Sequence, residues 1–276
     1  MAKDSGIEWT HHTFNPWWGC VKVSPACAHC YAESWARRVG MNLWGGDARR
    51  RFFSEKHWRE PVKWNEEAEK RATRARVSCA SMADVFEPRM DLDPWRKQLW
   101  TLIEQTPWLD WLLLTKRPGN IKHVYPWAKM PRENVWLGTT AETQKSADIR
   151  IERLLSVEAR VRFLSCEPLL SNIDLSRWLA KRQLGWVIAG GESGGQARPT
   201  HPNWIRSLRD QCHKTQVPFH LKQWGHWSPL REIVEKPRRI ELQDESGVKE
   251  LLTWRSKTLS GRLLDGRTWD GYPQTQ

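Results

Sequence analysis

Short apolar runs recur along the chain, and they constrain its fold more than any other feature. Each run is continuous rather than alternating and is rich in β-branched or aromatic residues, which is typical of strands buried on both faces of a parallel sheet. The runs predict strands over residues 76–81, 111–115, 135–139, 161–165, 186–190 and 218–222, with an earlier strand from about Ile7 to Thr10.

Segments with helical periodicity lie between these runs. Residues 91–104 place apolar side chains on one stripe, and residues 143–158 do the same with Ile149, Ile151, Leu154 and Leu155. Residues 202–214 open with a proline, which suits the first turn of a helix. Because strands and helices alternate, we predict an α/β fold built from parallel βα units, as a partial or complete (β/α) barrel rather than an open sheet.

The last part of the chain has a different composition. From residue 229 onward it is rich in charged residues and has few long apolar runs. We therefore predict a barrel over residues 1–228 and a basic C-terminal extension over residues 229–276. The extension is expected to form a small hairpin or an extended appendage that packs on the barrel.

Polar residues follow nearly every predicted strand. In parallel α/β folds the carboxyl ends of the strands form the ligand-binding face. An ordinary ion pair or helix cap explains any single one of these residues equally well, but the series as a whole indicates a binding site.

Three of the six cysteines lie within eleven residues, with the spacing C-x6-C-x2-C. They are Cys20, Cys27 and Cys30. Thiolates are soft ligands, and two of them separated by two residues can reach the same metal or cluster. Three thiolates on a [4Fe-4S] cluster leave one iron open for S-adenosylmethionine, and the cofactors then carry the radical chemistry while the protein positions them.

Zinc is the competing interpretation of these thiols. A structural zinc site needs a fourth ligand, which His29, His11 or His12 could supply. A zinc deaminase is excluded, because none of the nine histidines is followed two residues later by Glu. The other cysteines, Cys79 and Cys212 among them, are expected to be small core residues. Cys166 follows a predicted strand and is the one candidate hydrogen donor.

Charge and composition limit the partners. The formal net charge is +12, which favours polyanionic partners such as nucleic acid, although a solvated cationic face explains such a surplus as well. No run of 18 apolar residues exists, and the first residues lack the apolar core of a signal peptide. We therefore expect no membrane partner and a cytoplasmic location, in a bacterial host if the gene belongs to a phage.

Several segments together resemble the phage-associated three-cysteine-motif family, whose members look like radical S-adenosylmethionine proteins. The segments span most of the chain and include residues 15–20, 81–86, 114–118, 165–169, 190–194, 222–225 and 263–270. The resemblance implies a radical-SAM-type barrel, a [4Fe-4S] cluster on Cys20, Cys27 and Cys30, and S-adenosylmethionine as cofactor. The candidates for binding that cofactor or the substrate, chosen by their place on the barrel face, are Lys116, Glu142, Glu167 and Glu192.

The chain departs from the usual radical-SAM pattern in two places. Most such enzymes use C-x3-C-x2-C with an aromatic residue before the last cysteine, whereas the first spacing is longer here and His29 holds the aromatic place. The Gly190-Gly191-Glu192 sequence also follows a later strand than the Gly-Gly-Glu of many such enzymes.

The function implied is that of a radical S-adenosylmethionine enzyme that generates a 5′-deoxyadenosyl radical and acts on a nucleic-acid base or modified nucleotide. It would need an external electron donor and could use a partner protein. The alternative is a nucleic-acid-binding accessory protein that holds zinc or a cluster without radical turnover.

Overall fold

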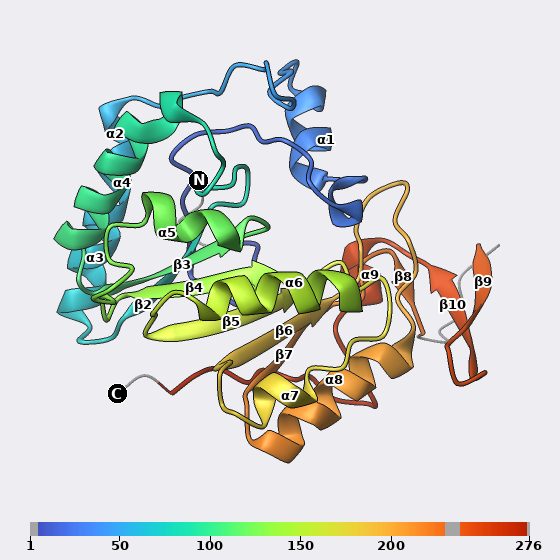
Figure 1. Ribbon diagram of the computed structural model, residues 1–276. Coiled ribbons are helices and arrows are strands. Elements are labelled where there is room, and N and C mark those ends of the chain that lie inside the picture. The colour runs from blue at the N-terminus through green and yellow to red at the C-terminus, as the bar shows by residue number, and fades with distance from the viewer. Residues whose placement is uncertain (1–4, 230–237, 275–276) are drawn as a thin grey trace. The chain divides into compact units, whose positions relative to one another are not determined.

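The computed structural model describes residues 5–229 and 238–274 (Figure 1). Seven strands follow one another in a sheet in the order of the sequence. They are β1 (His12–Thr13), β2 (Ala75–Cys79), β3 (Leu109–Thr115), β4 (Val135–Thr140), β5 (Val161–Cys166), β6 (Trp186–Gly190) and β7 (Phe219–Gln223). A doubly wound sheet reverses its strand order at a switch point. No reversal occurs among these strands, so the fold is of the (β/α) barrel type.

The barrel is partial because a segment near the end of the chain occupies the outer edge of β7. The backbone N–H of Leu221 donates to the carbonyl of Trp269 at 2.9 Å, and the N–H of Gly271 donates to the carbonyl of Phe219 at 2.9 Å. His220 and Asp270 face each other in an antiparallel bridge. The end of the chain therefore fills the position at which a closing strand would pair.

The chain divides into two compact units. The first comprises Met1–Thr139 and Arg150–Arg162, and the second comprises Thr140–Ile149 and Phe163–Gln276. The predicted boundary between residues 228 and 229 follows another criterion, the change in composition, and it remains a prediction.

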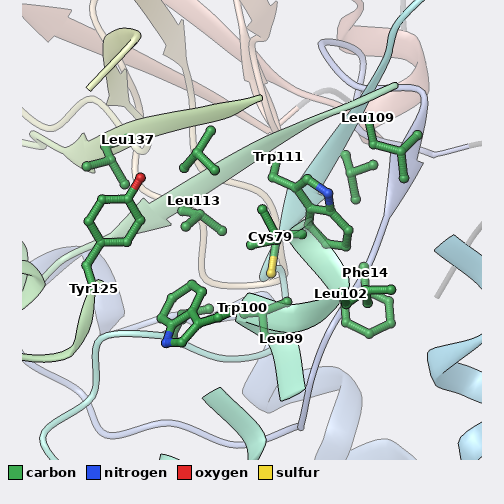
Figure 2. Packing of buried hydrophobic residues seen from close by; sticks show 14 of the residues in the cluster. Phe14, Cys79, Leu99, Trp100, Leu102, Leu109, Trp111, Leu113, Tyr125 and Leu137 are labelled. Atoms are coloured by element: carbon green, nitrogen blue, oxygen red, sulfur yellow. The ribbon is translucent and has the colours of Figure 1, made fainter. Parts of the chain in front are cut away.

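In the first unit, the helix α3 (Glu60–Lys70) packs against β2 and β3. The other helices of this unit are α1 (Tyr31–Arg38), α2 (Glu55–Trp58), α4 (Asp93–Gln105) and α5 (Ile121–Val124). Figure 2 shows the core of this unit, where Phe14, Leu99 and Trp111 meet around the thiol of Cys79. Trp111 and Phe14 meet edge to face, with ring centroids 5.7 Å apart. Cys79 is thus a core residue, as expected.

In the second unit, α8 (Pro202–Thr215) packs against β6 and β7, and α7 (Ser176–Leu179) packs against α8. Helix α6 (Gln144–Leu155) begins in this unit. Helix α8 buries Trp204, Ile205, Leu208 and Cys212, the residues that the sequence places on its inner stripe. Two loops then cross closely. A Cβ on Gly191 would lie 2.0 Å from the carbonyl oxygen of Trp224, which explains why glycine stands there.

The C-terminal extension contains the predicted hairpin. Strands β9 (Arg239–Gln243) and β10 (Lys249–Trp254) pair antiparallel, and β10 also pairs with β8 (Trp227–Ser228). The short helix α9 (Lys257–Ser260) follows. Trp227, Leu252 and Ala197 form a small apolar core under this sheet. Residues 230–237 of the extension lie outside the described residues.

Two expectations from the sequence are wrong. The early strand is β1 at His12–Thr13, because the segment from Ile7 to Thr10 forms a turn in which the N–H of Thr10 bonds the carbonyl of Ile7 at 3.0 Å. Ile149 does not belong to the buried stripe of α6, since it is 45% exposed while Ile151 and Leu154 are buried. The six later strands are confirmed within a few residues of their predicted bounds. Among the described residues, no helix is long and apolar enough to cross a membrane.

The tight crossing of the two loops yields a stability test. We expect Gly191→Ala to lower the free energy of unfolding by about 1–3 kcal/mol, because the added methyl group overlaps the backbone of Trp224. Urea denaturation measures the change. Gly195→Ala is the matched control, since nothing lies within 4 Å of a Cβ built there. Equal stability of the two variants would contradict the close approach.

Candidate metal and cofactor site

The segment that leads into the cysteines is fixed to the loop after β2. The side-chain oxygen of Asn15 accepts the backbone N–H of Met82 at 2.7 Å, and its amide donates to the hydroxyl of Ser81 at 3.1 Å. His57 Nε2 donates to the carbonyl of Asn15 at 2.8 Å. Asn15 is itself almost fully buried. These bonds determine where the chain enters the cysteine loop.

Gly19 places Cys20. Its φ is +115°, a conformation that favours glycine, and a Cβ there would lie 2.5 Å from the carbonyl oxygen of Leu43. The N–H of Gly19 donates to the carbonyl of Met82, and the N–H of Gly45 donates to the carbonyl of Cys20, both at 3.0 Å. The Trp-Gly-Cys sequence is therefore packed between two other loops of the first unit.

The guanidinium of Arg117 lies beside the thiol of Cys20. Arg117 Nη1 lies 3.7 Å from Cys20 Sγ, and Arg117 Nη2 donates to the carbonyl of Val21 at 2.7 Å. Burial and the nearby charge of Asp84 together raise the pKa of Cys20 to about 12, although the positive charge of Arg117 opposes both. A thiolate here would be stabilised by Arg117 once a metal or cluster displaced its proton.

Asp84 orients that arginine. Its carboxylate accepts Arg117 Nη1 at 2.8 Å, the hydroxyl of Thr115 at 2.7 Å and the backbone N–H groups of Phe86 and Lys116 at 3.0 and 3.2 Å. The side chain is only 7% exposed. Asp84 follows the predicted strand over residues 76–81, but the sequence does not mark it as part of the site, because no spacing rule links it to Arg117 thirty-three positions later.

Cys30 lies at the start of α1, directly after the short 3-10 turn Pro25–Cys27. Burial raises the pKa of the Cys30 thiol, while the nearby backbone N–H groups of Glu33 and Ala32 and the charge of Lys116 act to lower it. The side chain of Cys30 makes no capping hydrogen bond to the helix. A helix N-terminus favours a negative sulfur, so this position suits a thiolate ligand.

A buried ion pair supports the far side of the loop. Arg50 and Glu87 are almost fully buried, and Arg50 Nη2 lies 2.5 Å from Glu87 Oε1. Arg50 also donates to the carbonyls of Leu43, Gly45 and Ala48. The pair thereby holds the segment that covers Cys20. No sequence pattern predicts this pair, since two charged residues far apart in the chain predict nothing by themselves.

The three thiols are half-buried and free, and within residues 5–229 and 238–274 no three His, Cys, Asp or Glu side chains are gathered closely enough to hold a metal ion. Two histidines of the zinc alternative have other contacts. His12 stacks on Trp64 with ring centroids 4.5 Å apart, and His11 Nδ1 accepts the backbone N–H of Arg76 at 2.8 Å. The loop itself carries the three thiols and His29. Three thiolates with a cation beside one of them fit an iron–sulfur cluster, whereas a closed zinc site would need His29 as its fourth ligand.

The remaining candidates lie in the second unit, apart from Lys116. Glu192 is 6% exposed, and its carboxylate accepts the backbone N–H, Nε and Nη2 of Arg198 at 2.8, 2.8 and 2.5 Å. This hydrogen bond raises the pKa of Arg198, and the more distant charge of Glu142 adds to the effect. The bonds between Glu192 and Arg198 thus hold together the two ends of the loop that follows β6, and this structural role accounts for the burial of Glu192.

Glu167 is the more accessible carboxylate of this group. It pairs with Lys222 Nζ at 2.7 Å, and both side chains are 14% exposed. The amide of Gln223 lies 3.3 Å from Glu167 Oε1 and 3.2 Å from the hydroxyl of Ser193. Four polar side chains, from the segments after β5 and β6 and from the end of β7, are therefore brought together. The sequence placed Lys222 and Gln223 at the end of the predicted strand over residues 218–222 and gave no other indication of their role.

Glu142 and Cys166 are buried more deeply. Glu142 is 1% exposed, and its backbone N–H donates to the hydroxyl of Ser146 at 3.0 Å. Cys166 is fully buried at the end of β5, where burial raises the pKa of its thiol and the sulfur of Cys212 lies near enough to act on it. Packing in the core accounts for Cys166, as it does for Cys212 on α8.

Comparison with known proteins gives a family and a set of similar folds. Residues 4–273 match the family described as "Protein of unknown function (DUF5131)". No curated protein matches the sequence. No match supports the phage-associated three-cysteine-motif family.

Solved structures of spore photoproduct lyase are similar to this chain. A cysteine-to-serine mutant is 13% identical, covers 94% of this chain and 72% of its own, and has a TM-score of 0.48. A double mutant with bound AdoMet and dinucleoside spore photoproduct is 12% identical, covers 92% and 72%, and has a TM-score of 0.47. A complex with the dinucleoside spore photoproduct is 12% identical, covers 88% and 68%, and has a TM-score of 0.43.

The Arg50–Glu87 pair gives a test of what supports the cysteine loop. We expect Glu87→Gln to lower the free energy of unfolding by about 3–5 kcal/mol, because it leaves the buried guanidinium of Arg50 without its counter-charge. The control is Glu60→Gln, which breaks a partly exposed pair with Lys63 and should cost less than about 1 kcal/mol. If thermal or urea denaturation gives similar losses for both variants, the pair does not support the loop.

Proposed function

The chain belongs to the DUF5131 family, and from that premise we propose that it is a radical S-adenosylmethionine enzyme whose [4Fe-4S] cluster is bound by Cys20, Cys27 and Cys30. The observation that carries the proposal is the surroundings of these free thiols, where Arg117 contacts the sulfur of Cys20 and Cys30 stands at the N-terminus of α1. The proposal rests on these residues of the chain and on the spacing C-x6-C-x2-C, and not on the likeness to other structures.

The residues of the first unit have distinct tasks in this proposal. Arg117, oriented by Asp84, balances the charge of the Cys20 thiolate. The N–H groups of Ala32 and Glu33 do the same for Cys30. When bound, the cluster and S-adenosylmethionine supply a 5′-deoxyadenosyl radical that removes hydrogen from the substrate. Lys116, whose charge acts on Cys30, is the candidate to bind the methionine carboxylate.

The candidates of the second unit differ in how well they suit ligand binding. Glu167 is partly exposed and lies beside Lys222 and Gln223, so we assign to it the binding of cofactor or substrate hydroxyls. Glu142 and Glu192 are less accessible, and direct contact with a ligand would require the Glu192–Arg198 pair to open. Cys166 as a hydrogen donor would likewise need a route to its buried sulfur.

The substrate class in this proposal is a nucleic-acid base or a modified nucleotide, in a phage context. The net charge of +12 favours a polyanionic substrate. An external electron donor must reduce the cluster, and a partner protein is a candidate to deliver the electron. We also propose a cytoplasmic location, because all six cysteines are free and such thiols stay reduced there.

The cluster assignment predicts which cysteines matter. After anaerobic reconstitution, we expect iron and sulfide in the ratio of a [4Fe-4S] cluster, with visible absorbance that Cys27→Ala and Cys30→Ala abolish, since two thiolates hold such a cluster poorly. Cys212→Ala removes a thiol from the core and serves as the control that keeps its cluster. A full cluster in Cys27→Ala would remove Cys27 from the ligand set. A colourless protein with one zinc per chain would favour the accessory protein instead.

Turnover is tested separately. The reconstituted and reduced protein should release 5′-deoxyadenosine from S-adenosylmethionine, measured by liquid chromatography, whereas a protein that only binds a cluster should release none. Nucleoside analysis then tests the substrate class, with and without the gene expressed in infected cells. Chemically identical DNA and RNA in the two samples would contradict a nucleic-acid substrate.

A further inference from the structure

Helix α1 exposes its larger apolar side chains and buries its smaller ones. Tyr31, Trp35 and Val39, the residue that follows the helix, are spaced by four positions and are 56%, 43% and 46% exposed. Ala32 and Ala36 are buried on the opposite side. A surface helix that only completes a core shows the reverse arrangement. The exposed stripe on α1 (blue in Figure 1) therefore needs another explanation.

The aromatic rings next to this stripe are held in fixed positions by one another. Trp35 meets Trp18 edge to face at 5.0 Å, and Trp18 meets Phe53 in the same manner at 5.3 Å. The guanidinium of Arg51 lies 4.5 Å from the ring centre of Trp18 and 5.4 Å from that of Phe53. Trp35 is thus partly exposed and at the same time packed against Trp18. Such a ring loses little conformational freedom when a flat ligand stacks on it.

The charge around these rings is positive. Residues 17–59 contain eight Lys or Arg and three Asp or Glu. Arg50 is buried against Glu87 and Arg59 pairs with Glu55, so the other six cations make up the positive charge of this segment. One of the three acids, Glu33, is buried and is paired with both Lys22 and Arg37. Arg38 lies on α1 next to the stripe and is exposed. Aromatic faces interleaved with cations are the recurring composition of surfaces that bind single-stranded nucleic acid.

We propose that this aromatic–basic surface, formed by Tyr31, Trp35, Trp18, Arg51 and Arg38, binds single-stranded nucleic acid. Unpaired bases stack on Trp35 and Tyr31, and the arginines contact the phosphates. The choice of a single strand follows from stacking, because only an unpaired base offers its face to a side chain. The inference rests on the nucleic-acid substrate class of the proposed function and assigns a place to its binding.

The test is fluorescence anisotropy with a labelled oligothymidylate, on the full chain, both as purified and after cluster reconstitution. We expect Trp35→Ala to weaken binding at least about fivefold, which is the lower end of what one stacked base contributes. The control is Met130→Ala, which removes an 80% exposed apolar side chain elsewhere in the first unit and should leave binding unchanged. Circular dichroism checks that both variants are folded.

Two further variants separate stacking from other contacts. Trp35→Leu keeps an apolar side chain against Trp18 but has no flat face, so it should bind as weakly as Trp35→Ala. Tyr31→Ala should weaken binding in the same direction and replaces the Trp35 variants if these do not fold. Arg38→Ala should reduce the slope of log affinity against log salt by about 0.7, whereas Lys97→Ala, an exposed lysine on α4, should not.

Several outcomes would overturn the inference. They are no binding of oligothymidylate by the wild-type protein at low salt, equal affinity of wild type and the Trp35 and Tyr31 variants, and full binding by Trp35→Leu. The last result would point to an apolar protein contact. The measurement needs neither S-adenosylmethionine nor turnover, so a failure to release 5′-deoxyadenosine would count against the proposed function alone.

Discussion

The buried carboxylate of Asp84 is the group on which the candidate site depends. It accepts hydrogen bonds from Thr115, from two backbone N–H groups and from Arg117, and Arg117 in turn contacts the sulfur of Cys20 and the carbonyl of Val21. A buried carboxylate with this many donors has one stable arrangement, because each lost bond leaves a polar group unsatisfied. The ends of β2 and β3 thereby fix the position of a loop that has no regular structure of its own.

The other polar residues of the fold show how similar strand-end chemistry serves different purposes. Arg50 and Glu87 are buried and join loops, while Glu192 and Arg198 close the loop after β6. Glu167 and Lys222 keep some exposure and have an amide and a hydroxyl nearby. Burial, more than residue type, distinguishes the charges that support the fold from those that can meet a ligand.

Much of the fold could be read from the sequence, because parallel strands and their helices leave strong local patterns. The six runs from residue 76 onward were placed correctly, as was the inner stripe of α8. Weak patterns failed: β1 has only two residues, and the turn before it has the same β-branched and aromatic composition as a strand. Ile149 fits the helical period of α6 but lies at the edge of its stripe, where exposure is decided by neighbouring elements.

The sequence by itself determined the βα alternation and the three thiols with their spacing, since both depend on residues close together in the chain. Only the tertiary structure decided that the barrel stays partial, because the segment from Trp269 to Gly271 takes the edge of β7. It also decided that Arg117 and Asp84 join the thiols, and that α1 turns Tyr31 and Trp35 outward. These features arise from contacts between distant segments, which no local pattern records.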